Sequence, residues 1–170
     1  IGAGPNLALY TGDRRRLWPP LRFGLGVLWH LVRHGRGYDI VHTASFPYWP
    51  VLAAALVRPL YGYRLVVDWW EVWTLAYWRD YAGTVTGTVG WLVQRACVRL
   101  PQRAFCFSRL HARRLREEGL RGPLTTLRGI YDGPTASHGP VSAPEPYVLY
   151  AGRHIPEKRL LRIVPAVALA

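Results

Sequence analysis

Apolar residues along the chain alternate between short continuous runs and segments in which they recur with the period of a helix. Four runs have the length of buried strands, at 38–42, 63–68, 104–107 and 124–127. Segments of helical period separate these runs, and this alternation is typical of β-α units arranged around a parallel sheet. The pattern therefore predicts an α/β fold with a Rossmann-like parallel sheet and flanking helices.

Three helices are predicted between these strands. The first runs through 51–57, and the second is a longer amphipathic helix near 89–100. The residues expected on the buried face of the second helix are Val89, Leu92, Val93, Ala96, Cys97 and Leu100. Ser108 is placed to cap a third helix, which should carry Leu110 and Leu115 inward and stop at Gly119.

The segment 14–36 differs from the rest because it interleaves arginines with tryptophans and aliphatic residues. Trp18 and Trp29 belong to it, and Gly24 and Gly26 weaken it as a helix. A basic amphipathic segment that carries tryptophans can lie in a membrane interface. An ordinary helix with its apolar face on the sheet explains the segment equally simply, and we favour that interpretation.

A stretch rich in Pro, Gly, Ser and Ala occupies 133–146 and is predicted to be a linker between two domains. Residues 1–132 would then form the first domain, whose N-terminus we expect to be incomplete. After the linker a new strand, a Gly-Arg turn and a helix start follow one another. Residues 147–170 are therefore expected to be the truncated start of a second Rossmann-like domain.

Composition narrows the classes of protein that fit. The formal net charge of +12 would favour an anionic partner. The basic residues are dispersed along the chain, however, and Lys158 is the only lysine. We therefore attribute most of the excess positive charge to a general bias toward arginine. Cys97 and Cys106 lack a metal-ligand spacing and are interpreted as buried thiols. The longest uncharged run, 40–57, contains prolines and polar residues and makes a poor membrane-spanning helix.

The most specific pattern surrounds the predicted linker. Its motifs, in order, are Gly129-Ile130-Tyr131-Asp132, then Tyr147-Val148-Leu149-Tyr150-Ala151-Gly152-Arg153, then Pro156-Glu157-Lys158-Arg159. In their order and spacing these motifs resemble those of glycosyltransferase family 4, which are retaining enzymes of the GT-B fold. That fold pairs an N-terminal acceptor-side domain with a C-terminal donor-binding domain. Upstream, 38–42 is similar to that family's Asp-Val-Val-His strand, and 68–73 to its Trp-His-Glu-Val-Trp stretch.

The resemblance implies that Gly152, Arg153 and Lys158 bind the diphosphate of a nucleotide-sugar donor, and that Arg153 and Lys158 stabilise the leaving group without a metal or other cofactor. Glycosyl transfer from such a donor leaves a diphosphate that gains negative charge, which fixed cations can offset. A strand end and a first helical turn also favour phosphate through backbone amides. The alternative is that both cations are solvated surface charges.

Candidate acceptor-side residues lie near predicted strand ends. Glu71 follows a strand, where α/β sheets gather ligands, and it joins Arg153 and Lys158 as a candidate catalytic residue. A helix cap or an ion pair with an arginine explains Glu71 equally well. His42, Asp68 and Trp70 are further acceptor-side candidates, although His42 taken alone is better explained as a satisfied buried histidine.

An aromatic cluster accompanies these candidates and has two interpretations, contact with sugar or lipid and ordinary core packing. Its members are Trp69, Trp70, Trp73, Tyr77, Trp78 and Tyr81. The chain also departs from the family pattern. Trp70 stands where relatives carry His before the Glu, and Pro165 interrupts what should be a long helix of the second domain.

The leading hypothesis is retaining transfer of a hexose from a UDP- or GDP-linked sugar to a saccharide or lipid-linked acceptor, as in polysaccharide biosynthesis. This chain alone is expected to be inactive, because the family's paired glutamates would lie beyond residue 170. We expect a cytoplasmic location with peripheral contact at the inner face of the cell membrane, and no specific nucleic-acid partner. The alternatives are a non-catalytic basic module that binds anionic membrane or nucleic acid, and a degenerate transferase.

Overall fold

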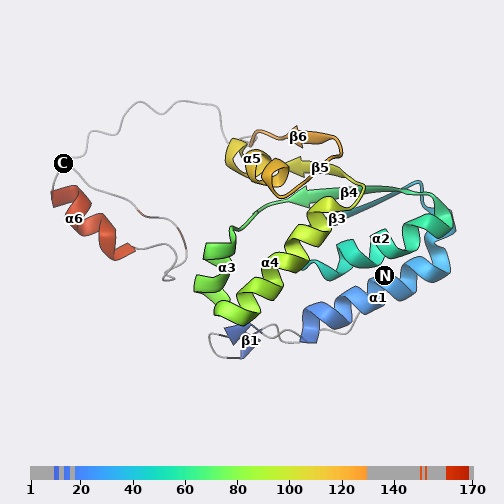
Figure 1. Ribbon diagram of the computed structural model, residues 1–170, viewed down its shortest axis with the longest axis horizontal. Helices are drawn as coiled ribbons and strands as arrows, with labels where there is room; N and C mark the ends of the chain where they lie inside the picture. The colour runs from blue at the N-terminus through green and yellow to red at the C-terminus, as the bar shows by residue number, and fades with distance from the viewer. Residues whose placement is uncertain are drawn as a thin grey trace. The chain divides into compact units, whose positions relative to one another are not determined.

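The computed structural model describes residues 10–11, 14–15, 18–129, 150, 152 and 160–168 (Figure 1). The chain divides into two compact units, Ile1–Ile130 and Tyr131–Ala170. The predicted linker at 133–146 and the candidate cations Arg153 and Lys158 lie outside the described residues.

A four-stranded parallel sheet forms the centre of the first unit, and it confirms the predicted α/β fold. The strands stand in the order β3 (Ile40–Ala44), β4 (Arg64–Trp69), β5 (Arg103–Cys106) and β6 (Leu124–Thr126). All three neighbouring pairs are parallel. Each strand overlaps one of the four apolar runs.

Helices connect the strands in chain order, and they include α2 (Trp49–Tyr61), α3 (Leu75–Ala82), α4 (Thr84–Arg99) and α5 (Arg109–Glu117). Figure 1 shows α2 and α4 on the same side of β3 and β4, with α1 (Trp18–His34) beside α2. The side chains of β4 alternate accordingly. Leu65, Val67 and Trp69 are buried, whereas Val66 and Asp68 are only half-buried and face the other side of the sheet.

The N-terminal part of the predicted basic segment is not helical throughout. Arg14–Arg15 pairs as a short antiparallel strand, β2, with β1 (Tyr10–Thr11). The helix α1 begins only at Trp18, and Pro19 and Pro20 occupy its first turn, where a missing amide hydrogen costs nothing. The predicted helix therefore exists, but its inner face packs mainly against α2 and not against the sheet as expected.

The structure corrects the predicted face of the long helix. The buried residues of α4 are Gly87, Gln94, Cys97 and Val98. Val89 and Leu92, both expected inside, are more than half exposed, whereas Cys97 is fully buried as expected and Val93 and Leu100 pack partly buried against the core. The helix is rotated because its glycines let it approach α3: a Cβ at Gly87 would lie 2.2 Å from the carbonyl oxygen of Trp78, and one at Gly90 would lie 2.7 Å from the Trp78 ring.

The predicted cap of α5 is confirmed. The Ser108 hydroxyl accepts a hydrogen bond from the backbone amide of His111 at 3.1 Å, and Leu115 is fully buried. The helix ends at Glu117, and Gly119 follows in a left-handed conformation with φ of 106°. The expectation for Leu110 is wrong, because its side chain is largely exposed on this short helix with a narrow buried face.

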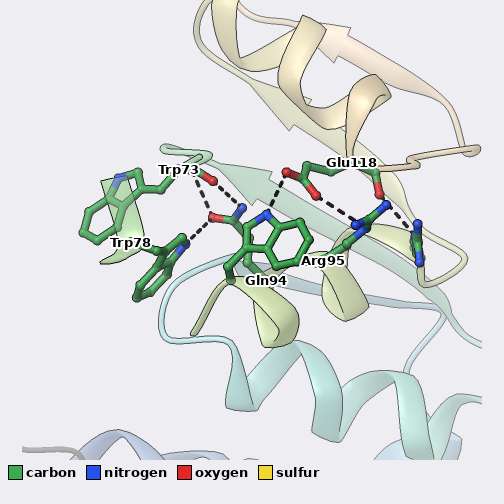
Figure 2. Close-up of polar contacts among 7 residues, drawn as sticks. Trp73, Trp78, Gln94, Arg95 and Glu118 are labelled. Atoms are coloured by element: carbon green, nitrogen blue, oxygen red, sulfur yellow. Dashed lines mark hydrogen bonds and ion pairs between the residues drawn. The ribbon is translucent and has the colours of Figure 1, made fainter. Parts of the chain in front are cut away.

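A buried glutamine joins α4 to the segment that follows β4 (Figure 2). The Gln94 Oε1 atom accepts hydrogen bonds from the Tyr48 hydroxyl (3.1 Å), the Trp73 amide (3.0 Å) and the Trp78 indole (3.2 Å). Its Nε2 atom donates to the Trp73 carbonyl at 2.8 Å. Gln94 thus pairs with both the backbone amide and the backbone carbonyl of Trp73, which lies outside regular secondary structure, and it fixes the segment after β4 in place.

In the second unit, the described residues form a 3-10 turn, η3 (Leu160–Arg162), followed by the short helix α6 (Ile163–Ala168). Pro165 was expected to interrupt a long helix. It lies instead in the first turn of α6, where no intrahelical partner is needed for its nitrogen. The predicted helix start near Pro156 lies outside the described residues.

Candidate functional site

Aromatic and polar side chains meet at the carboxyl edge of the sheet, where β4 and β5 end side by side. Trp70 and Glu71 directly follow β4, and Phe107 and Ser108 directly follow β5. The Trp70 indole stacks on the Phe107 ring, with centroids 4.3 Å apart and an interplanar angle of 16°. Trp70 remains 58 % exposed, so the stacked pair presents a flat apolar surface to solvent.

Glu71 is held in place by the loop that carries it. The Trp73 indole donates a hydrogen bond to Glu71 Oε2 at 2.9 Å. From α5, the Arg114 Nη1 atom donates to the Val72 carbonyl at 2.8 Å, and Gln94 holds the backbone of Trp73. Glu71 therefore projects from a loop that is anchored on two helices.

The two alternative explanations for Glu71 do not describe its contacts. The residue that caps α3 is Thr74, whose side chain accepts from the Tyr77 amide. The ion pairs found within the described ranges of the chain join other residues. Glu71 is exposed, and its carboxylate keeps acceptor capacity beyond the single indole hydrogen bond.

His111 adds an imidazole to this edge that the sequence analysis missed. Burial lowers its pKa, and the nearby Arg114 guanidinium lowers it further, while Glu71 and the Trp70 backbone act in the opposite direction. The ring is therefore neutral at neutral pH. Its Nδ1 atom is buried and has no hydrogen-bond partner among the residues that the structure describes. A neutral imidazole beside a carboxylate can accept a proton or orient a hydroxyl group.

A sequence signal for His111 does exist. His111 is the third residue of α5, the helix that follows β5 and is capped by Ser108. The first turn of a helix at the carboxyl edge of a parallel sheet borders the ligand crevice. Because no motif marks a histidine at this position, only the buried Nδ1 atom of its partly buried ring and its electrostatic interaction with Glu71 single it out.

His42 and Asp68 form a separate pair on the half-exposed face of the sheet. The His42 Nε2 and Asp68 Oδ2 atoms are 3.0 Å apart, on the neighbouring strands β3 and β4. The interpretation of His42 as a buried histidine is wrong, because its side chain on β3 is 57 % exposed. These two predicted acceptor-side residues therefore lie together, and none of the hydrogen bonds or ion pairs among the described side chains joins them to Glu71 or His111.

The predicted aromatic cluster is divided between core and surface. Trp69 and Trp78 are buried, and Trp73 packs against the core. Tyr77 and Tyr81 are exposed, with parallel rings 6.4 Å apart, and both contact Trp73. Most of the cluster thus has a structural role, and Trp70 is the member that faces solvent at the carboxyl edge.

The donor-side candidates are described only in part. Gly152 lies at a bend, where a Cβ would approach the Tyr150 hydroxyl to 2.6 Å, whereas Arg153 and Lys158 fall outside the described residues. Across the ranges that are described, no group of three or more His, Cys, Asp or Glu side chains could hold a metal ion. None of the described helices is long and apolar enough to cross a membrane.

A hollow of about 420 Å³ lies at the opposite end of the strands. Its lining includes Asp39 and Arg64, which border the start of β3 and open β4. Ligands of open α/β sheets bind outside the carboxyl ends of the strands, so we place the candidate site at the edge that carries Glu71 and not at this hollow.

No family model, curated protein or solved structure matches the chain.

Proposed function

We propose that this chain contributes the acceptor side of a retaining glycosyltransferase, which moves a hexose from a UDP- or GDP-linked sugar to a saccharide or lipid-linked acceptor. One observation carries the proposal. At the carboxyl edge of a Rossmann-like sheet, the exposed Trp70–Phe107 stack, the Glu71 carboxylate and the neutral imidazole of His111 all follow the ends of the neighbouring strands β4 and β5. Aromatic faces and hydrogen-bonding groups together suit a sugar, which has apolar C–H faces and polar hydroxyls.

Each residue has a role in this proposal. The Trp70 indole stacks on a ring of the acceptor saccharide, and Glu71 accepts a hydrogen bond from the acceptor hydroxyl. His111 orients that hydroxyl from the α5 side of the edge. Trp70 stands where the resembling family carries His, so His111 supplies an imidazole to the same edge from a different element.

The donor side of the proposal rests on the sequence resemblance. Gly152, Arg153 and Lys158 bind the diphosphate, and the two cations offset the charge that it gains. In the reaction the bond from the sugar C1 to the diphosphate oxygen breaks and a bond from C1 to the acceptor oxygen forms. The acceptor hydroxyl passes its proton to the departing diphosphate oxygen, and the nucleoside diphosphate leaves with the electron pair of the broken C1–O bond.

Acceptor binding can be measured on this chain by saturation-transfer NMR with a panel of oligosaccharides and soluble analogues of lipid-linked saccharides. We expect Trp70→Ala to lower affinity by about 10-fold or more, the loss of one stacking surface of roughly 1.5 kcal/mol. Glu71→Gln and His111→Gln should weaken binding less. Trp29→Ala, which removes an equally exposed indole from α1, is the matched control and should leave saccharide binding unchanged.

The reaction itself is tested by transfer of radiolabelled hexose from UDP- and GDP-sugars, using the polypeptide that the whole gene encodes. Arg153→Ala and Lys158→Ala should each lower the rate by about 10²-fold or more. Saccharide binding without transfer would identify a degenerate transferase. If no saccharide binds and no hexose is transferred, the proposal is wrong.

A further inference from the structure

The helix α1 carries two apolar faces, and only one of them is used inside the fold. Its inner face packs against α2 through Gly24 and Leu31, both buried. The approach is close, because a Cβ at Gly24 would lie 2.3 Å from the Trp49 Cβ atom. This contact accounts for the helix as an element of the fold, but it leaves the apolar residues of the opposite face without a role.

The outer α1 face consists of Trp18, Leu25, Trp29 and Val32. Their side chains are 58, 51, 58 and 42 % exposed. With 3.6 residues per turn, the four positions fall within about 60° of one another on the side of the helix opposite Gly24 and Leu31. Two exposed indoles and two aliphatic side chains in one row form a patch of the kind that marks an interaction surface.

Positive charge accompanies this apolar row. Arg22 and Arg33 lie beside it on the helix, both exposed, and α1 contains no acidic residue. The Arg33 guanidinium lies over the Trp29 ring, 3.8 Å from its centroid. Within the described part of the chain, no ion pair involves either arginine, so no described carboxylate neutralises their charge.

We infer that the outer α1 face binds the surface of an anionic phospholipid membrane. The helix of 17 residues, about 25 Å long, lies parallel to the membrane plane. The indoles and aliphatic groups enter the boundary between headgroups and acyl chains, where tryptophan is favoured, and the guanidiniums pair with lipid phosphates. Because the inner face of α1 stays packed on α2, the helix lies on the membrane and does not span it.

Charge complementarity selects the membrane over a second copy of the chain. A self-association through this face would bring Arg22 and Arg33 of one copy against the same residues of the other, with no carboxylate on α1 to offset them. An anionic lipid surface supplies the missing negative charge. The inference is independent of the proposed transferase activity, because the face involves none of the residues at the carboxyl edge of the sheet.

Vesicle flotation tests the inference on the full chain. Wild-type protein should float with vesicles of 70 % phosphatidylcholine and 30 % phosphatidylglycerol and bind pure phosphatidylcholine at least about 10-fold more weakly. The double variant Trp18→Ala/Trp29→Ala should lose at least about 10-fold in partitioning to the anionic vesicles. Arg22→Gln/Arg33→Gln should keep weak binding but lose the preference for anionic lipid and the sensitivity to salt.

Two controls distinguish this result from misfolding and from the proposed function. Far-UV circular dichroism should match wild type for every variant, because all four substituted side chains are exposed. Trp70→Ala removes an indole of equal exposure from the carboxyl edge and should leave vesicle binding unchanged. Unchanged flotation of a folded Trp18→Ala/Trp29→Ala variant would overturn the inference, as would dimerisation in light scattering that this variant abolishes.

Discussion

Replacing Gln94 with Met removes four hydrogen bonds from the interior while nearly conserving side-chain volume. The Tyr48 hydroxyl and the Trp78 indole are the costly losses, because both residues are buried and their donors would be left without Oε1. An unsatisfied buried donor costs about 1–3 kcal/mol. Trp73 is only partly buried and can exchange its backbone partners for water. We therefore expect Gln94→Met to lower the free energy of unfolding by about 3–4 kcal/mol.

Urea titration followed by tryptophan fluorescence and by circular dichroism measures this change, with coincident transitions as the check on two-state behaviour. The control is Thr86→Ala, an exposed position on the same helix, which should change the free energy by less than about 0.5 kcal/mol. A loss below about 1 kcal/mol for Gln94→Met would show that water or rearranged side chains satisfy the donors, and would refute the assignment of Gln94 as the anchor of the segment after β4.

Three further predictions concern the packing of α4 and the two buried cysteines. Gly87→Ala should destabilise the fold by about 1–3 kcal/mol despite the better helix propensity of Ala, because the new Cβ would meet the backbone of Trp78. The control is Gly37→Ala, whose Cβ would meet nothing within 4 Å and which should be neutral in the same urea titration. Burial raises the pKa of the Cys97 thiol to about 12, so neither it nor the buried Cys106 should react with a thiol reagent at pH 8 until urea unfolds the chain. Because the pKa of this thiol is about 9 in the unfolded chain, the stability that Cys97 contributes should be complete below about pH 9 and be lost as the pH rises toward 12. Fast labelling of Cys97 in native buffer would contradict both its low reactivity and this pH dependence.

The sequence by itself determined the fold class and most element positions. Four apolar runs became four parallel strands, because a strand that packs under helices and between neighbours needs a continuous apolar segment whatever its exact partners. The cap at Ser108 was equally local, since a serine hydroxyl reaches the amide three residues later without help from the rest of the chain. The candidacy of Glu71 followed from the same reasoning, because a residue after a parallel strand lies at the ligand-binding edge.

Tertiary structure alone decided which faces are buried and which side chains meet. Apolar periodicity placed Val89 and Leu92 inside, but two glycines allow a close approach to Trp78, and the hydrogen bonds of Gln94 turn the helix to another face. The partners of Glu71 and the missed His111 depend on where α5 packs, which no local pattern encodes.

The same limit explains His42 and the outer face of α1. The His42 side chain is exposed on one face of β3, and whether that face is covered depends on how distant elements pack and not on the residues around it. The outer face of α1 became identifiable only once Gly24 and Leu31 were seen to pack on α2. Local sequence fixes which elements form because their hydrogen bonds and caps are short-range, whereas burial and proximity are set by long-range packing between elements that the local pattern does not specify.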